Sequence, residues 1–205
     1  KPLYLGKYEI REITAPGGYV LNTEIRTAEL AYAGQEIEIA ETAADFYNER
    51  QKAAVSLDKV LEQNEQFGIG MNGEITAVTF GLFAAEDLTA ADGSIIPADG
   101  LLEILSVDEN GHAVCKTDLP FGSYYLKELS TDGHYILSDE KYPIVFDYAG
   151  QDTALVEIKV NNGNPIGNDL IYGEIHGLKK DEDGNALGGA LIGLFKADCT
   201  EFTRE

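Results

Sequence analysis

Short stretches in which apolar and polar residues alternate run along most of the chain, and the clearest of them occurs twice. Near the first residues, Tyr8 and Ile10 alternate with charged residues, and the same order returns within residues 119–129. A period of two places one set of side chains on the buried face of a β-strand and the other on its exposed face. In both copies the alternation puts a glutamate, Glu12 or Glu128, on the apolar face. We therefore predict two equivalent strands, each directing a carboxyl group towards a hydrophobic core.

The two strands belong to a longer internal repeat. Similarity at a domain-length period indicates tandem copies of one structural unit. We predict residues 1–50 to be the C-terminal half of one unit, residues 51–170 a complete unit, and residues 171–205 the N-terminal part of a third. The matching positions, at a constant offset of 116 residues, are Gly6 and Gly122, Tyr8 and Tyr124, Glu12 and Glu128, Gly17 and Gly133, Tyr19 and Tyr135, and Leu21 and Leu137.

Short strands bounded by turn residues predict an all-β class, with one β-sandwich for each unit. Asn110-Gly111 is typical of a tight turn, so residues 104–107 and 112–116 are expected to form a hairpin. Residues 62–73 are expected to form a long loop or a hairpin, and glycine and proline predict a loop at residues 88–102. The other expected strands are 55–59, 75–84, 122–129, 142–148, 154–160 and 166–170, with 24–32, 37–46, 175–179 and 190–196 in the flanking units.

Composition narrows the range of partners. Thirty-six acidic residues against fifteen basic ones give a net charge of −21, which argues against nucleic acids and anionic membranes as partners. No apolar run approaches the roughly 18 residues of a spanning helix, so no membrane insertion is expected in this segment. Cys115 and Cys199 fall in different units and cannot form a disulfide within one unit. Cys115 is expected to behave as a small buried hydrophobic residue.

Two further polar residues of the complete unit fall on apolar faces. Lys59 follows Val55 and Leu57 at alternate positions, so the lysine shares their face of the strand. Asn168 comes two residues after Ile166, which places its amide on the apolar face of the last strand. A buried amine, a buried amide and the buried carboxyl group described above are therefore expected on three strands of one sandwich.

The spacing of these residues recurs between neighbouring units. Eleven positions separate Asn48 from Lys59, and eleven separate Asn168 from Lys179. An asparagine on the last strand of one unit thus precedes a lysine on the first strand of the next. Glu12, Asn48 and Lys179 are accordingly expected to be members of incomplete sets in the flanking units.

Two assignments stay open at this point. Asn161 and Asn162 are alternatives to Asn168, although the spacing places them in a hairpin inserted before it. Lys180 stands next to Lys179, so either could be the reactive lysine of the third unit.

The three buried polar groups permit two interpretations. They could form a satisfied hydrogen-bond network within the core. Alternatively, burial disfavours the charged forms of Lys59 and Glu128 and gives a neutral amine beside a protonated acid. The acid would then polarise the Asn168 carbonyl and transfer the proton while the amine attacks, and the amide nitrogen would leave as ammonia.

These motifs resemble those of Cna B-type domains, the SpaA-like pilin domains of Gram-positive surface proteins. The resemblance implies a prealbumin-like β-sandwich in which lysine and asparagine form a spontaneous isopeptide bond with the help of the glutamate. Lys59 would be the nucleophile, Asn168 the electrophile and Glu128 the proton shuttle. The similar segments are Val-x-Leu-x-Lys59, Gly122-x-Tyr-x-Leu-x-Glu128, Ile-x-Asn168, the glutamate box Glu12-Ile-Thr-Ala-Pro-Gly-Gly-Tyr19, and Lys179-Lys-Asp-Glu-Asp-Gly184.

The expected function is structural: stalk domains of an extracellular, cell-wall-anchored adhesin or pilin-like protein. The alternative is an adhesin module that binds a host protein or glycan, for which an exposed aromatic cluster would be the sign. An enzyme is disfavoured, because no histidine stands beside a nucleophile motif. The acidic turns at 108–110 and 181–183 lack the ligand spacing of a calcium loop, so no metal or cofactor is expected. The complementary half-units predict head-to-tail association between molecules.

Overall fold

The computed structural model describes residues 3–90 and 92–198, and the chain divides into two compact units, residues 1–171 and 172–205. The first unit contains the named strands, whereas helical structure in the described residues is limited to two short 3-10 turns. The elements are β1 Gly6–Arg11, β2 Ile25–Leu30, β3 Lys52–Leu61, η1 Glu74–Ala77, β4 Thr79–Ala84, β5 Leu88–Thr89, β6 Ile95–Ile96, β7 Leu101–Ser106, β8 His112–Val114, β9 Gly122–Ser130, β10 Lys141–Phe146, β11 Leu155–Lys159, η2 Val160–Gly163 and β12 Ile166–Asn168.

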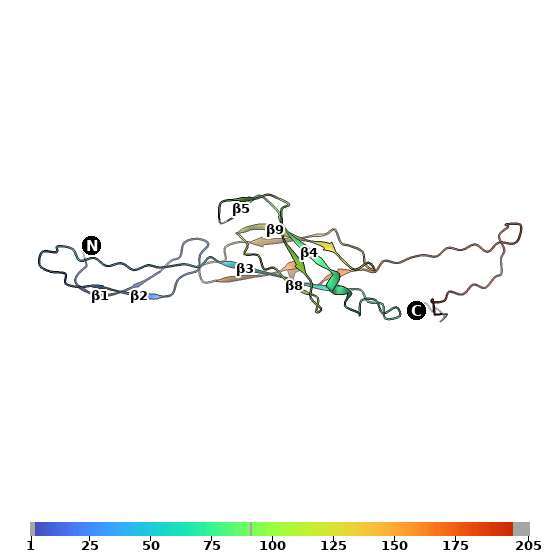
Figure 1. Ribbon diagram of the computed structural model, residues 1–205, viewed down its shortest axis with the longest axis horizontal. Helices are drawn as coiled ribbons and strands as arrows, with labels where there is room; N and C mark the ends of the chain where they lie inside the picture. The colour runs from blue at the N-terminus through green and yellow to red at the C-terminus, as the bar shows by residue number, and fades with distance from the viewer. Residues whose placement is uncertain (1–2, 91, 199–205) are drawn as a thin grey trace. The chain divides into compact units, whose positions relative to one another are not determined.

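Two four-stranded sheets between residues 52 and 168 form a β-sandwich (Figure 1). One sheet has the order β10-β9-β4-β7, with antiparallel neighbours throughout. The other is built around β3, which pairs with β8, β11 and β12. This arrangement confirms the all-β sandwich that the alternation predicted.

The core lies between the two sheets, where each central strand contributes alternate apolar side chains. Val55 and Leu57 of β3 face residues of the opposite sheet and are almost completely buried. Burying a side chain of this size contributes about 1.5–3 kcal/mol, so this layer holds the two sheets together. The opposing residues include Phe80 and Leu82 of β4, Tyr124 and Leu126 of β9, and Ile144 and Phe146 of β10.

The last strand of the sandwich is interrupted. Both β11 and β12 run parallel to β3, the first beside residues 52–56 and the second beside residues 59–61. Between them, η2 contains two asparagines in the left-handed conformation, Asn161 at φ 54° and Asn162 at φ 55°. The prediction of an inserted hairpin is therefore wrong, because the segments before and after the turn run in the same direction.

The hairpin predicted around Asn110-Gly111 is also wrong. The turn exists, since the Asp108 amide donates to the His112 carbonyl at 2.9 Å, but β7 pairs with β4 whereas β8 pairs with β3. The turn thus carries the chain from one sheet to the other. The predicted strand at residues 75–84 is shorter than expected, because residues 74–77 form η1 and β4 starts at Thr79.

Gly111 provides a test of how closely this crossover approaches β3. Its φ is +81°, and a Cβ placed there would overlap the Lys59 carbonyl oxygen. We expect Gly111→Ala to lower the free energy of unfolding by about 3 kcal/mol, because backbone strain and the overlap add together. Gly93→Ala is the matched control, since Gly93 has a φ of +84° with open space around it and should lose only about 1 kcal/mol. If urea unfolding gave equal losses of unfolding free energy for the two variants, contact between Gly111 and the Lys59 carbonyl would not explain the effect.

The repeat predicted from sequence is present in the backbone. Ile10 of β1 pairs with Arg26 of β2, just as Leu126 pairs with Tyr142 in β9 and β10. The expected strand at residues 37–46 does not form, and Ile37 and Ile39 there are exposed. Alternation alone cannot make a strand where no neighbouring strand supplies hydrogen bonds.

Residues 172–198, the described part of the second unit, contain a turn but no named strand. The Asp181 amide donates to the Asn185 carbonyl at 3.0 Å, and Lys180 forms an isolated bridge with Ala186. The predictions of strands at residues 175–179 and 190–196 are therefore wrong. Among the helices that the structure describes, none has the length and apolar character required to cross a bilayer.

Candidate functional site

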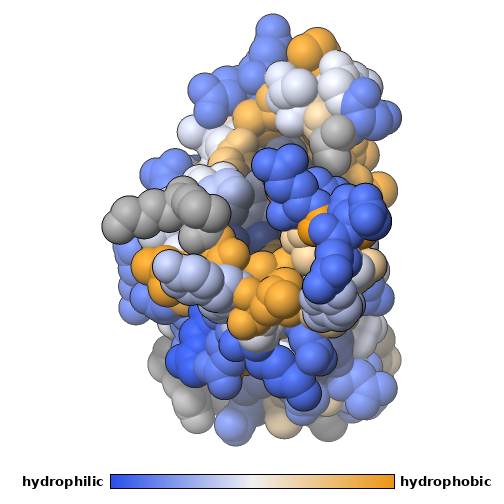
Figure 2. All heavy atoms as spheres, turned by 90° about the vertical axis from the view of Figure 1, so that its left-hand side faces the viewer, coloured by the Kyte–Doolittle hydropathy of each residue, from blue (hydrophilic) through white to orange (hydrophobic). Residues whose placement is uncertain are grey.

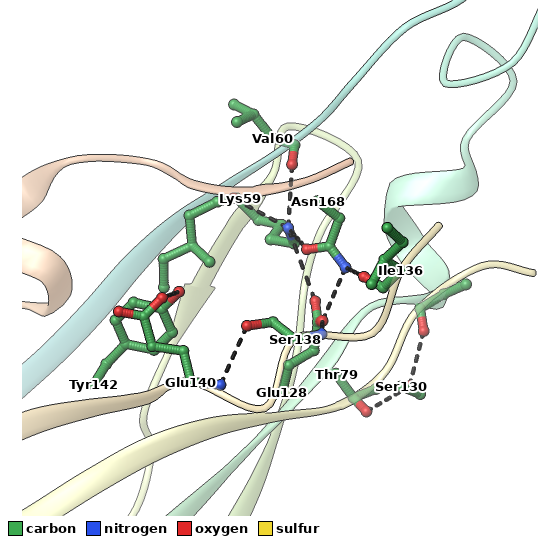
Figure 3. A network of polar contacts seen from close by, with 12 residues as sticks. Lys59, Val60, Thr79, Glu128, Ser130, Ile136, Ser138, Glu140, Tyr142 and Asn168 are labelled. Atoms are coloured by element: carbon green, nitrogen blue, oxygen red, sulfur yellow. Dashed lines mark hydrogen bonds and ion pairs between the residues drawn. The ribbon is translucent and has the colours of Figure 1, made fainter. Parts of the chain in front are cut away.

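Lys59 lies near the end of β3 with its side chain inside the sandwich. Its strand alternates, so the lysine follows Val55 and Leu57 into the core and remains 2% exposed. The amine donates to the Val60 and Ile166 carbonyls, each at 3.1 Å, and to Oδ1 of Asn168. The amine is therefore held against the side-chain amide of the neighbouring strand (Figure 3).

Asn168 reaches the amine because of the parallel register between β12 and β3. Ile166 lies beside Lys59, and Asn168 lies beside Leu61, two positions further along the same face. Ile166 and Asn168 are both buried, whereas Gly167 between them is exposed. The alternation that buries Ile166 therefore also directs the amide into the core.

Glu128 approaches from the opposite sheet. On β9 it follows Tyr124 and Leu126 at alternate positions, and it is 1% exposed. Its Oε2 accepts hydrogen bonds from Nδ2 of Asn168 at 2.8 Å and from the Ser138 amide at 2.9 Å. Its Oε1 lies 3.8 Å from Nζ of Lys59 and has no hydrogen-bond partner among the described residues. One carboxyl group thus faces the amine with one oxygen and the amide nitrogen with the other.

The backbone fixes the orientation of the Asn168 amide. The Ile136 carbonyl can only accept, and Nδ2 donates to it at 2.9 Å. The amide nitrogen must therefore point towards Ile136 and Glu128, while Oδ1 faces Lys59. The carboxyl group contacts the amide nitrogen and not, as expected from the sequence, the carbonyl oxygen.

Burial makes the lysine more readily deprotonated. Desolvation lowers the pKa of Lys59 from 10.5 to about 8, and this effect outweighs the attraction of the nearby Glu128 and Asp169 carboxylates. Each unit of pKa corresponds to about 1.4 kcal/mol, so the neutral amine is far more accessible here than in a solvated lysine. The site thus combines a weakly basic amine, an oriented amide and a bridging carboxyl group within the core.

An incomplete copy of this site lies in residues 12–48. Nδ2 of Asn48 donates to Oε2 of Glu12 at 2.6 Å and to the Val20 carbonyl at 2.9 Å. The Asn22 amide donates to the same carboxylate oxygen at 2.7 Å. These contacts reproduce, group for group, those that hold Asn168 to Glu128, Ile136 and Ser138. The carboxyl group and the amide of the candidate site are thus repeated in residues 12–48.

The remaining candidate residues lie elsewhere. Asn161 is occupied locally, because its Nδ2 donates to the Asn164 carbonyl at 3.2 Å, and Asn162 is exposed in the same turn. Lys179 and Lys180 are both exposed in the second unit. The backbone partners at 136 and 138 were missed from sequence, although the loop that carries them repeats at the offset of 116 residues.

The described cysteine takes no part in this site. Cys115 is half-buried, and its thiol donates to Oε2 of Glu103 at 3.0 Å. Burial, with the adjacent carboxylate, raises the pKa of the thiol to about 12. Cys199 lies outside the described residues. Within residues 3–90 and 92–198, no group of three or more His, Cys, Asp or Glu side chains is arranged to hold a metal ion.

Comparisons with known proteins identify the class of fold. A solved structure described as the Bacillus anthracis TIE protein is 18% identical, with a TM-score of 0.52, and the match covers 96% of this chain and 34% of that one. The Streptococcal ancillary pilin is 20% identical with a TM-score of 0.37 over 98% of this chain and 59% of its own. The minor pilin GBS52 of Streptococcus agalactiae is 14% identical with a TM-score of 0.37, over 78% of this chain and 74% of its own.

The fold assignment rests on the first of these structures, of which the chain spans about a third. The described part of the protein shares the β-sandwich fold of that structure, which confirms the all-β sandwich class that the sequence predicted. No family model matches the chain, and no curated protein matches it.

Proposed function

We propose that this chain is a structural stalk segment of a pilin-like or adhesin-like protein on a Gram-positive cell surface. In this proposal residues 51–170 form a complete domain, and residues 1–50 and 171–205 belong to its neighbours. The domain is closed by an isopeptide bond between Lys59 and Asn168. The observation that carries the proposal is the burial of an amine, an amide and a bridging carboxyl group in direct contact, although burying unpaired charges is costly.

The proposed reaction needs no enzyme or cofactor. Nζ of Lys59 transfers a proton to Oε1 of Glu128 and attacks Cγ of Asn168. The carboxyl group then protonates Nδ2, the bond between Cγ and Nδ2 breaks, and the nitrogen leaves as ammonia. The new amide nitrogen gives its remaining extra proton to the departing ammonia, so the products are a secondary amide joining the two side chains, one ammonium ion and a regenerated carboxylate. Holding the groups in contact supplies the high effective concentration that amide exchange requires.

A branched peptide would identify the bond directly. Proteolysis of the denatured chain should yield the peptide containing Lys59 joined to the peptide containing Asn168, and tandem mass spectrometry should locate the branch at these two residues. Recovery of both peptides separately, each at its calculated mass, would show that the three groups form only a buried hydrogen-bond network.

The rate of bond formation should depend on pH in a way that reveals the role of the carboxyl group. Lys59 has a pKa of about 8, so below that pH the pair of Lys59 and Glu128 retains one transferable proton. The fraction in which this proton has moved to the acid does not change with pH, so we expect a constant rate between about pH 6 and 7.5. Above about pH 8 the pair loses its proton and the rate should fall, because the carboxyl group then holds no proton to deliver to the leaving nitrogen.

This profile can be measured by refolding. Chain recovered unfolded from inclusion bodies would be diluted into buffers between pH 6 and 10, and the loss of ammonia followed by intact mass. A rate that rises through pH 8 and then stays constant would indicate a simple amine nucleophile and would contradict the proton relay.

A further inference from the structure

β7 is an edge strand of the sandwich with one open side. It pairs with β4 on one side, and among the residues that the structure describes no strand pairs with it on the other. The Val107 amide donates to the Val78 carbonyl at 3.3 Å, and antiparallel pairing alternates, so Leu105 also directs its backbone groups to β4. Ile104 and Ser106 therefore direct their N–H and C=O groups away from the sheet.

The other edges of the sandwich carry features that hinder pairing with a further strand. β10 contains a proline, Pro143, which has no N–H group, and a lysine, Lys141, whose charge resists being covered. β8 and β12 are each three residues long, and β11 carries the charged residues Glu157 and Lys159. β7 has six residues and neither a proline nor a basic residue. A further strand can therefore be added most readily at β7.

The charged side chain of β7 is tied to the opposite sheet. Oε2 of Glu103 accepts hydrogen bonds from the Thr117 amide at 2.9 Å and from the Lys116 amide at 3.0 Å. These bonds join the segment after β8 to β7 and hold the edge strand in position. Glu103 therefore adds a fixed negative charge at this edge of the sandwich.

An apolar row crosses the outer face of the same sheet and ends at β7. Pro143 lies beside Tyr125, and Phe83 lies between Tyr125 and Leu101. The rings of Phe83 and Tyr125 stack with their centroids 5.1 Å apart. On β7, Leu101 and Ile104 are 50% and 56% exposed. Opposed side chains on one face of a sheet pack together, so the apolar side chains of an added strand would extend this row.

The apolar surface around β1 and β2 is a different case. Figure 2 shows apolar side chains gathered there, with hydrophilic residues around them. In the proposed function residues 1–50 belong to a neighbouring domain, so the remainder of that domain would cover these side chains. β7 instead lies in the middle of the sandwich formed by residues 52–168, between strands that the structure describes.

The charge around β7 favours a basic partner. Asp108 and Glu109 directly follow the strand and add to the charge of Glu103, with Lys116 as a basic residue beside them. The whole chain carries a net charge of −21, so a second copy is repelled at long range whereas a basic peptide is attracted.

We propose that β7 binds an extended basic peptide of another protein as an added antiparallel strand. The peptide residue opposite Ile104 exchanges two backbone hydrogen bonds with it, and the residue two positions earlier does so with Ser106. Apolar side chains at these two positions share the face of Ile104, and a basic residue at the following position lies opposite Glu103. This binding surface is additional to the stalk role and does not depend on the bond between Lys59 and Asn168.

Amide hydrogen exchange of the full chain, followed by NMR, tests the open edge. In the free chain the amides of Ile104 and Ser106 should exchange rapidly, whereas the Leu105 amide, bonded to β4, should be protected. The probe is the peptide acetyl-Lys-Thr-Val-Thr-Val-Lys-Thr-amide, which should protect both exposed amides when it binds. Protection of these amides in the free chain, or unchanged exchange at about 1 mM peptide, would overturn the proposal.

Methylated peptides distinguish strand addition from non-specific apolar binding. N-methyl groups on the two valines remove the donors that face Ile104 and Ser106 and should weaken binding by about tenfold or more. The matched control carries N-methyl groups on the two threonines that precede the valines, whose N–H groups face away from β7, and should bind like the unmodified peptide. Equal weakening by the two modifications would overturn the added strand.

A variant of the chain gives the same test from the other side. Ile104→Pro removes the donor on the open side and gives β7 the residue that β10 has at Pro143, so the sandwich should fold and peptide binding should be lost. The control Ile104→Val should bind like the wild type. Binding that survives Ile104→Pro would overturn the proposal, and the methylated peptides decide the question if this variant does not fold.

Charge identifies the class of partner. Binding of the lysine peptide should weaken as salt is raised, and a peptide with glutamate in place of both lysines should not bind. Equal binding of the two peptides would overturn the basic partner. Light scattering that shows dimers of the wild-type chain, lost in Ile104→Pro, would assign the edge to a second copy and would likewise overturn the proposal.

Discussion

The Glu128→Gln variant should fold but should not form the proposed bond between Lys59 and Asn168. Glutamine has the size of glutamate and can still accept from Nδ2 of Asn168, so the sandwich should form. It cannot take a proton from the amine and return it to the leaving nitrogen. A positioned general acid or base contributes about 10²- to 10⁴-fold to such a reaction, and we expect the rate of ammonia loss to fall by at least this factor.

The matched control is Glu140→Gln. Glu140 is exposed immediately before β10, where it accepts a hydrogen bond from the Tyr142 hydroxyl at 3.0 Å. The Glu140→Gln substitution removes the same negative charge, but Glu140 contacts neither the Lys59 amine nor the Asn168 amide. Intact mass during refolding should show the wild-type rate for this control. A wild-type rate for Glu128→Gln would mean that the amine and the amide react without the carboxyl group.

Loss of the bond should produce the largest change in stability. Lys59 and Asn168 are 109 positions apart, so the bond closes nearly the whole domain into one loop. In the chain-entropy treatment used for disulfides, a loop of this length restricts the unfolded state by about 5 kcal/mol. We expect Lys59→Met, which keeps a long side chain, to lower the free energy of unfolding by about this amount and the midpoint temperature by on the order of 15 °C.

Lys59→Met also leaves the Val60 and Ile166 carbonyls without their hydrogen-bond donor, which lowers the free energy of unfolding independently of the bond. Asn168→Ala removes the same bond from the other strand and disturbs different neighbours. Urea unfolding should give similar losses for the two variants, and the double variant should lose little more than either one. Fully additive losses would show that the stability comes from separate local contacts and not from a shared bond.

The sequence predicted the strands of the site because each lies in a complete sheet with a buried face. On β3, the alternation of Val55 and Leu57 correctly predicts that Lys59 faces the core. On β9, the alternation of Tyr124 and Leu126 does the same for Glu128. The bond itself remains a prediction. The contacts that orient the amide come from the backbone at Ile136 and Ser138, and side-chain patterns do not reveal backbone groups.

The errors share a physical cause. Alternation at residues 37–46, 175–179 and 190–196 predicted strands, but within the part of the chain that the structure describes these segments belong to no named sheet. The turn at Asn110-Gly111 predicted a hairpin because local turn chemistry does not specify which sheet each flanking strand joins. The strand predictions thus failed where the pattern of side chains said nothing about the pairing of the backbone.

The intact mass of the denatured wild-type monomer tests the central claim most directly. Formation of the bond between Lys59 and Asn168 releases one ammonia, so the mass should fall short of the value calculated from the sequence by one ammonia. Lys59→Met, Asn168→Ala and Glu128→Gln should each show the full calculated mass. A folded wild-type chain at its full calculated mass would contradict the account.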